Sequence, residues 1–273
     1  MKLNISFIKL FTKFVIKFTK PKKWRTRKYT EYEYIKELVK FVKCGVYWRR
    51  YNRKINGRVL NNKHHEYIKL GIYKAFYKQL LEKYFKNNKT TKLKYQSIDT
   101  SFVPNKYGVK ISKRNKYYKN KKGIKISTIV DKYGIPISIF LIGAHRNDSI
   151  TVNDTIMRML IKTDTKKYKN HNRFKQYFLA DKGYDTKSVR DILKKKHYIS
   201  IIAHNKRNTK NTNKIYKLTQ IEKIKYKKRI IVENYFGWLK IYPKMSYFYE
   251  KTIYSFENLV YFISAILLFN REF

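Results

Sequence analysis

Three acidic residues lie far apart in a chain that contains few acids. Asp99 follows an apolar run in QSIDTSF, Asp181 follows another in YFLADKGYD, and Glu233 lies within YKKRIIVENYFGWLK. The whole chain has 65 Lys and Arg residues against 18 Asp and Glu residues. Three converging carboxylates would offer Mg²⁺ the hard oxygen ligands that it takes together with water and phosphate oxygens. Two such ions activate a water or a 3′-hydroxyl for in-line attack on a phosphodiester, so the acids indicate a candidate site for that chemistry.

The segment around Glu233 reads as an amphipathic helix that starts near Tyr226. On a helical wheel measured from that residue, Arg229 falls at about 300°, Glu233 at about 340° and Lys240 at about 320°. The opposite arc is apolar and is filled by Ile231, Val232, Tyr235, Phe236 and Leu239. The polar stripe sets a carboxylate among cations that bind phosphates, beside a tyrosine that can donate its hydroxyl or stack on a base. An ordinary i,i+4 salt bridge between Arg229 and Glu233, worth about 0.3–0.5 kcal/mol, explains the same spacing.

Each acid also has a simpler interpretation. Asp99 fits a turn or capping residue, and Asp181 fits a helix cap, although Asp185 and Thr186 are better placed for that role. Asp148, in AHRNDS, is predicted to cap the helix that follows it. The catalytic interpretation gains weight because one sheet topology would bring the three acids to the same edge.

Residues 93–273 alternate between strand-like and helix-like patterns. Three strands come first, in LKYQSIDTSF, GIKISTIVD and GIPISIFLIGA, and DKYG joins the last two as a hairpin turn. Helix, strand, helix, strand and helix follow, in SITVNDTIMRMLIK, KQYFLADKGYD, TKSVRDILKKKH, HYISIIAH and YKKRIIVENYFGWLK. This β-β-β-α-β-α-β-α order predicts an α/β domain with a mixed sheet and flanking helices, in the order of a ribonuclease-H-like domain. A last helix, SFENLVYFISAILLFN, is apolar enough to be buried.

Residues 1–92 read as a separate, basic and helical region. Thr30 and Glu33 form a predicted capping box, and HHEYIKLGIYKAFYKQLLEKYF reads as one further helix. Short helices rich in Lys and Arg predict a small DNA-binding unit, for example of helix-turn-helix type. His64 and His65 have no companions at metal-ligand spacing, so we expect surface or packing roles for them. The opening MKLNISFIKLFTKFVIKFTK reads either as a basic arm that touches DNA or as a surface helix docked on the body.

Composition limits the partners and the compartment. The formal net charge of +47 favours a polyanionic partner such as nucleic acid, although the codon bias of an AT-rich genome also raises the lysine content. Hydrophobic residues make up 43% of the chain, which argues against disorder. Cys44 is the only cysteine, which excludes an intramolecular disulfide and a cysteine-rich zinc finger and suits a reducing, intracellular compartment. The opening segment lacks the run of about 18 apolar residues that a membrane span needs, so we expect no membrane partner.

These residues together resemble the IS4/IS5 superfamily of DDE transposases, in its IS5-like branch. The superfamily signature Y-x2-R-x3-E-x6-K is met by Tyr226, Arg229, Glu233 and Lys240. Its first aspartate, at the end of strand one, matches Asp99, and its second, in a motif of the form ADKGYD, matches Asp181. The segment VYWRRYNRKING resembles the N-terminal part of that branch more loosely, and the whole resemblance runs from about Trp24 to Asn270.

The resemblance implies a ribonuclease-H-like catalytic domain with two Mg²⁺ or Mn²⁺ ions held by the three acids. It implies that Tyr226, Arg229 and Lys240 contact DNA beside them. The expected function is transposition, a form of DNA recombination, in which the protein binds the terminal inverted repeats of a transposable element. It would cleave the ends and join the 3′-hydroxyls to target DNA, as a homodimer because two ends are handled together. Such a protein works inside the cell with DNA, in the cytoplasm or nucleoid of a prokaryote or in the nucleus for a eukaryotic or viral element.

Two other functions fit the same residues. A domesticated or decayed transposase would keep DNA binding without metal-dependent nicking. A ribonuclease or repair nuclease on this fold would cut without needing particular end sequences and without strand transfer. The complete set of six signature residues favours the transposase.

Overall fold

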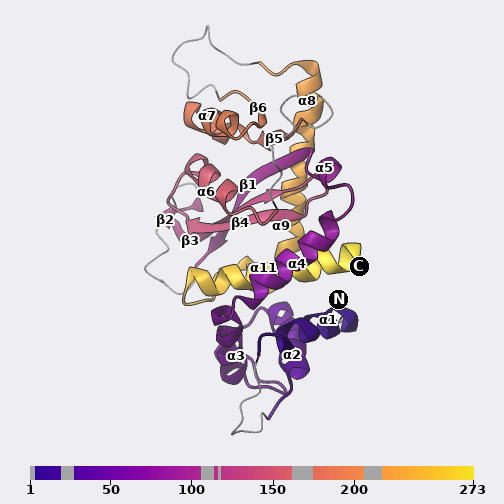
Figure 1. Cartoon of the computed structure of the whole chain (residues 1–273). Coiled ribbons are helices and arrows are strands. Elements are labelled where there is room, and N and C mark those ends of the chain that lie inside the picture. Colours follow the sequence, from indigo (N-terminus) through magenta and orange to yellow (C-terminus); the bar gives the residue numbers. More distant parts are fainter. Residues whose placement is uncertain (1–3, 20–27, 106–113, 116–117, 162–174, 206–216) are drawn as a thin grey trace. The chain divides into compact units, whose positions relative to one another are not determined.

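The computed structural model describes residues 4–19, 28–105, 114–115, 118–161, 175–205 and 217–273, and Figure 1 shows their mixed α/β fold. The chain divides into two compact units. Unit 1 comprises Met1–Leu80, Asn105–Val109 and Trp238–Phe273, and unit 2 comprises Leu81–Pro104 and Lys110–Gly237. The predicted domains have other bounds, residues 1–92 and 93–273. Their roles in DNA binding and catalysis stay predictions.

Unit 2 is built on a mixed sheet of six strands. The strands are β1 (Tyr95–Pro104), β2 (Arg114–Asn115), β3 (Lys121–Val130), β4 (Pro136–Gly143), β5 (Tyr177–Ala180) and β6 (Ile199–Ile202). Their order is β2-β3-β1-β5-β6, and β4 also pairs with β3. β3 runs antiparallel to β1 and β4, whereas β5 runs parallel to β1 and β6. The five predicted strands and their mixed pairing are confirmed, and the short β2 adds to them.

The β3–β4 hairpin closes on Asp131, the first residue of the predicted DKYG turn. One oxygen of its buried carboxylate accepts hydrogen bonds from the backbone N–H groups of Tyr133 and Ile135, each at 2.9 Å. The other oxygen accepts a hydrogen bond from the Tyr84 hydroxyl at 2.9 Å. Gly134 has a φ of +84°, a conformation that glycine adopts without steric cost. Burial raises the pKa of Asp131 to about 6, against the opposing effect of these hydrogen bonds.

Helices flank the sheet of unit 2. They are α5 (Lys89–Lys92), α6 (Thr151–Met157), α7 (Lys187–Lys195) and α8 (Gln220–Lys227), with 3₁₀ turns η3 (Asp148–Ile150), η5 (Lys182–Tyr184) and η8 (Lys228–Ile230). α6 contacts β3 and β4, α7 and α8 contact β6, and η8 contacts β1 and β5. Thr186 caps α7 by accepting a hydrogen bond from the backbone N–H of Val189, in agreement with the sequence. The next helix, α9 (Ile231–Lys240), begins in unit 2 and ends in unit 1.

Unit 1 is mainly helical. It contains α1 (Ile5–Ile16), α2 (Glu31–Cys44), η1 (Trp48–Arg50), α3 (Gly57–Lys69), most of α4 (Ile72–Phe85), α10 (Pro243–Ser246) and α11 (Ile253–Glu272). The predicted capping box of Thr30 and Glu33 is present at the start of α2. The single helix predicted for HHEYIKLGIYKAFYKQLLEKYF is wrong, because Gly71 adopts a left-handed φ of +65° and separates α3 from α4.

α1 packs on other helices of unit 1. Its Phe7 and Phe11 are buried, and the Phe11 ring centroid lies 4.6 Å from that of Phe76 and 5.4 Å from that of Phe262. Asn4 caps the helix by accepting a hydrogen bond from the Phe7 N–H at 2.9 Å. Of the two interpretations of the opening segment, the docked helix is the one observed.

α11 is the buried C-terminal helix that the sequence predicts. Phe262, Ile263 and Leu268 are among its fully buried side chains. In the described part of the chain it is the one helix long and apolar enough to cross a membrane. Because 72% of its most apolar window is buried inside the protein, we interpret it as a core helix.

A chain of buried polar contacts links α3, α4 and α11 through His64. The Tyr73 hydroxyl lies 2.8 Å from its Nδ1 and the Ser255 hydroxyl 3.1 Å from its Nε2. Ser255 donates its own proton to Glu250 at 2.8 Å, so its oxygen accepts from the Nε2–H of a neutral His64, and Nδ1 accepts from Tyr73. His64 therefore has the packing role expected of it, and His65 is exposed.

We expect His64 to make unit 1 less stable in acid. Burial, the largest cause, lowers the pKa of His64 to about 3 from its ordinary value of 6.5. Between these values the unfolded chain binds a proton here and the folded chain does not. The free energy of unfolding should therefore fall as the pH falls, by up to about 1.4 kcal/mol per pH unit from this group. Urea midpoints of wild type and His64→Gln, measured from about pH 7 to about pH 4, should give the variant the shallower slope, and equal slopes would contradict the assignment.

Candidate catalytic site

The sheet register brings Asp99 and Asp181 to equivalent places on neighbouring strands. β1 and β5 are parallel, and Ser97 pairs with Leu179 at the end of their ladder. Asp99 and Asp181 each lie two residues beyond that pair. Since neighbouring parallel strands advance by the same rise, about 3.3 Å per residue, the two acids lie next to each other at this end of the sheet. The expectation that these two strands are neighbours is confirmed.

Asp99 carries its negative charge in an unfavourable place. Burial first, and then the nearby charges of Asp148 and Asp181, raise the pKa of Asp99 to about 6. The backbone N–H of Thr100 donates to Asp99 Oδ1 at 2.8 Å, and Arg229 Nη1 lies 3.8 Å from Oδ2; both favour the charged form. A carboxylate that its neighbours repel is stabilised by a bound cation, so this environment suits a metal ligand.

Contacts between lysine and tyrosine dock the signature segment on the sheet. Tyr95 and Tyr177 are partners in the β1–β5 ladder, and their rings stack with centroids 5.3 Å apart. The ammonium of Lys228 lies 4.2 Å from the centroid of the Tyr95 ring, and that of Lys225 lies 4.1 Å from the centroid of the Tyr177 ring. A cation–π contact contributes about 0.5–2 kcal/mol. The two cation–π contacts hold the residues immediately before Arg229 over β1 and β5.

The predicted single helix through YKKRIIVENYFGWLK is wrong in one respect. Residues Lys228–Ile230 form the 3₁₀ turn η8 between α8 and α9. η8 is the part of the segment that contacts β1 and β5, so tertiary contacts override the regular α-helical pattern here. The apolar arc of the predicted wheel is nevertheless buried at Val232, Tyr235, Phe236 and Leu239.

Arg229 links the acids of this region. Its Nη2 lies 2.8 Å from Glu233 Oε1, and its Nη1 lies 3.8 Å from Asp99 Oδ2. Burial acts to lower the pKa of Arg229, but the surrounding Tyr226 and acids, Asp181 included, raise it overall. Tyr226 in turn donates its hydroxyl to Asp181 Oδ1 at 3.3 Å. The i,i+4 salt bridge of the simpler interpretation is present, but Arg229 also lies in the field of acids from two neighbouring strands.

Lys240 is the exposed last residue of α9, about two helical turns beyond Glu233. It belongs to unit 1, whereas the three acids belong to unit 2. Its expected contact with DNA stays a prediction.

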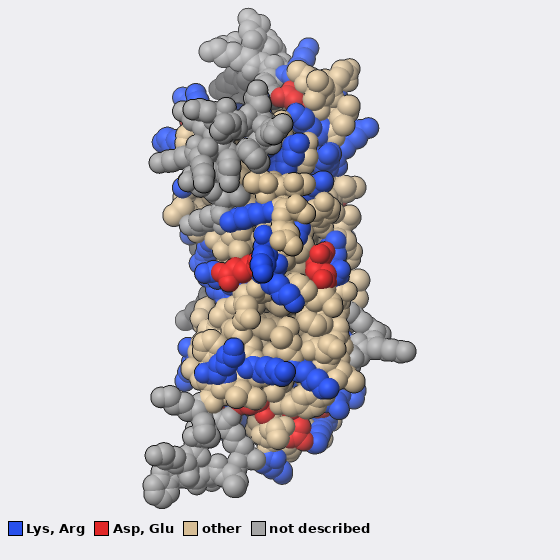
Figure 2. Space-filling view, turned by 45° about the vertical axis from the view of Figure 1, so that its right-hand side comes forward, with Lys and Arg blue, Asp and Glu red and all other residues tan. Residues whose placement is uncertain are grey.

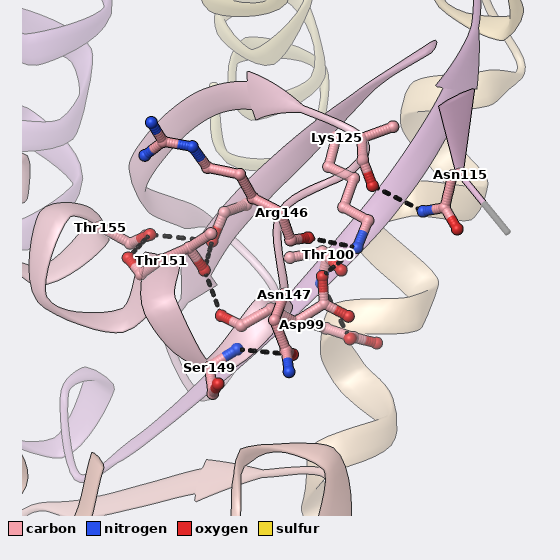
Figure 3. A network of polar contacts seen from close by, with 12 residues as sticks. Asp99, Thr100, Asn115, Lys125, Arg146, Asn147, Ser149, Thr151 and Thr155 are labelled. Carbon is pink, nitrogen blue, oxygen red and sulfur yellow. Dashed lines mark hydrogen bonds and ion pairs between the residues drawn. The ribbon is translucent and has the colours of Figure 1, made fainter. Parts of the chain in front are cut away.

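Asp148 is a fourth acid in this region, and the prediction that it caps the following helix is wrong. Asn147 is the N-cap of η3 and accepts a hydrogen bond from the backbone N–H of Ser149. Asp148 Oδ1 instead lies 2.7 Å from the ammonium of Lys125. The same ammonium donates to the Arg146 carbonyl at 3.0 Å (Figure 3). The Lys125 side chain is 8% exposed, and a buried ammonium requires a counter-charge.

The carboxylate oxygens of Asp99, Asp181 and Glu233 are the type of donor that a hard divalent cation takes. Within the described ranges, no group of three or more His, Cys, Asp or Glu side chains is arranged to hold a metal ion. Tyr184 in η5 is buried, and its side chain interacts with that of Thr100, the residue after Asp99. After burial, the charges of Asp99, Asp148 and Asp181 raise the pKa of this phenol. A buried hydroxyl beside carboxylates is one more oxygen donor of the kind that binds a hydrated cation.

The sequence interpretation missed the residues that position this site. In the sequence, Tyr95 and Tyr177 are typical strand residues, and the ADKGYD motif does not indicate a role for Tyr184. Lys125 had one usable signal, because a lysine within the otherwise apolar strand GIKISTIV is a candidate for a buried ion pair. No local pattern pointed from Lys125 to Asp148.

Comparison with known proteins identifies the domain family of the chain. A family model described as a transposase DDE domain matches residues 89–245, which is more than half of the chain. No curated protein and no solved structure matches. The matched span contains the two register-related aspartates, the η8 turn and Glu233, all within one compact unit. The chain belongs to the DDE transposase domain family.

Proposed function

We propose that this transposase binds the terminal inverted repeats of a transposable element, cleaves the element ends and joins them to target DNA. The observation that carries the proposal is the β1–β5 register, which sets Asp99 beside Asp181, together with Arg229, which reaches from Asp99 to Glu233. The spacing of Tyr226, Arg229, Glu233 and Lys240 supports the IS4/IS5 superfamily and its IS5-like branch. The strand order, three antiparallel strands followed by two parallel ones, supports a ribonuclease-H-like catalytic domain.

Asp99, Asp181 and Glu233 would hold the divalent metal, which we propose to be two Mg²⁺ or Mn²⁺ ions. Bound there, the ions would supply Lewis acidity and a nucleophile at neutral pH. Tyr226, Arg229 and Lys240 would orient the DNA through its phosphates. Their cationic and hydroxyl groups are the kinds that position a DNA backbone without reading its sequence.

The reaction balances without an external energy source. In cleavage, a water oxygen forms a bond to phosphorus, the bond to the 3′-oxygen breaks, and a proton converts that oxygen to a 3′-hydroxyl. In joining, the 3′-hydroxyl oxygen attacks a phosphorus of the target and displaces another 3′-oxygen, so one phosphodiester replaces another. In each step the nucleophile loses one proton and the leaving 3′-oxygen gains one, so the protons balance as well.

The charge of the protein supports DNA as the partner. Figure 2 shows a face on which Lys and Arg side chains outnumber Asp and Glu side chains, in keeping with the formal net charge of +47. We propose that the basic helices of residues 1–92 contribute to this binding, that the working form is a homodimer holding two ends, and that the protein acts inside the cell. The expected salt dependence is steep, since each phosphate contact releases counterions.

An excision assay tests the proposal. A plasmid carries a marker between the native flanks of the gene, the protein is supplied in trans, and the donor junctions are sequenced. We expect loss of the marker with junctions at the inverted repeats. We expect it only from a protein that can use Mg²⁺ or Mn²⁺. DNA binding without excision would favour the domesticated or decayed alternative. Cutting without defined ends and without strand transfer would favour a nuclease.

A further inference from the structure

Arg229 already supplies positive charge to the acids of the candidate site. Its guanidinium lies 2.8 Å from a Glu233 oxygen and 3.8 Å from an Asp99 oxygen, and the side chain is only 20% exposed. A guanidinium that binds a carboxylate in this way uses the oxygen lone pairs that would otherwise ligate a cation. Arg229 and a divalent cation would therefore compete for the same carboxylate oxygens.

The backbone next to Arg229 is held on the sheet, whereas its side chain can exchange a carboxylate partner for a phosphate. Lys228 and Lys225 hold the neighbouring chain on the stacked Tyr95 and Tyr177 rings. Glu233, the nearer of the two acids that pair with Arg229, is 48% exposed, so the ion pair borders solvent and is open to competition. Arginine binds phosphate with the same bidentate geometry with which it binds carboxylate.

We propose that Arg229 is an internal counter-ion of Glu233 and Asp99, and that a divalent ion displaces its guanidinium from Glu233 so that it can bind a DNA phosphate. The inference rests on the proposed function, because it takes the acids to be metal ligands. A guanidinium and a divalent ion both carry positive charge, so they repel each other when both bind the same carboxylate. Metal and DNA therefore bind cooperatively, each favouring the arrangement that the other needs.

Metal binding to the DNA-free, full-length protein provides the first test. The free Mn²⁺ concentration is followed by electron paramagnetic resonance for wild type, Arg229→Gln and Lys223→Gln. Lys223 is an exposed lysine on α8, outside η8, so its variant loses the same unit of charge from another element. We expect Arg229→Gln to bind Mn²⁺ about tenfold more tightly than wild type, and Lys223→Gln to stay within about twofold of it. Equal or weaker Mn²⁺ binding by a folded Arg229→Gln protein would overturn the proposal.

DNA binding in the presence of a chelator provides a second test, which does not depend on how Arg229→Gln folds. Glu233→Gln should release Arg229 without metal and tighten binding to a short duplex several-fold. Glu222→Gln removes the same charge from α8, where an amide can still accept the capping hydrogen bond from Thr219. If the two variants gain affinity equally, the effect is general electrostatics and the proposal fails.

Asp99→Asn separates failure of this inference from failure of the proposed function. If Asp99→Asn weakens Mn²⁺ binding while Arg229→Gln leaves it unchanged, the acids bind metal and only the counter-ion role is wrong. If neither Asp99→Asn nor Glu233→Gln changes Mn²⁺ binding, the metal-site assignment itself fails, and the counter-ion role fails with it.

Discussion

Glu233→Gln is expected to lower metal-dependent cleavage of element ends by about a thousandfold or more without weakening DNA binding. The amide keeps the size of the side chain, but it no longer carries the charge that holds Arg229 and that a divalent ion requires. Loss of one ligand removes several kcal/mol of stabilisation from a transition state that depends on the metal, and each 1.4 kcal/mol or so is a factor of about ten in rate. Because the Glu233 side chain is 48% exposed, the fold should not change.

The measurement is strand cleavage of a labelled duplex that carries one element end, resolved on a denaturing gel with Mg²⁺ or Mn²⁺. Fluorescence anisotropy on the same duplex reports DNA binding. Glu222→Gln is the matched control and should cleave at nearly the wild-type rate. A Glu233→Gln protein that cleaves normally would remove Glu233 from the catalytic set.

Glu250→Ala is expected to lower the free energy of unfolding of unit 1 by about 3–5 kcal/mol. Glu250 is 3% exposed and lies 3.2 Å from the ammonium of Lys244, which is fully buried. Its carboxylate also accepts hydrogen bonds from Trp48 Nε1 at 3.0 Å and from Ser255 at 2.8 Å. Alanine would leave a buried ammonium without its counter-charge and two donors without their acceptor.

Urea unfolding of the full chain, followed by tryptophan fluorescence, measures this loss. Glu272→Ala, at the exposed end of α11, controls for the general effect of removing an acid from so basic a chain. If Glu250→Ala does not fold, Glu250→Gln and the double variant Glu250→Gln with Lys244→Met isolate the charge. The double variant should recover part of the loss, and a double variant no more stable than Glu250→Gln would mean that the buried ion pair is not the cause.

Elements that depend on neighbouring residues could be predicted from the sequence. The capping box at Thr30 needs only Glu33, and the DKYG turn needs only the backbone that Asp131 itself binds. The contact between Arg229 and Glu233 needs one helical turn. Interactions of this range depend little on the rest of the fold, so pattern and spacing are sufficient to find them.

The acids of the candidate site were identified as candidates by their rarity and their positions after apolar strands. Whether these acids lie close together depends on the order of the strands in the sheet, which the sequence predicted in outline. The pairing register of β1 and β5 could not be predicted from the sequence. It matters because a shift of one residue would turn Asp181 to the opposite face of the sheet. That register is held by long-range contacts, such as the buried hydrogen bond of 2.8 Å between Gln96 and Gln176, 80 residues apart.

The sequence by itself therefore determined the strand and helix types, the acids and the signature that marks a DDE transposase, because side-chain periodicity, turn chemistry and residue type act locally. Only the tertiary structure decided that Asp148 pairs with Lys125, that η8 interrupts the signature helix, and that Arg229 lies between Glu233 and Asp99. Each of these depends on burial and on charges brought together from distant segments. A buried charge takes whichever partner the completed fold places beside it, because leaving it unpaired costs several kcal/mol.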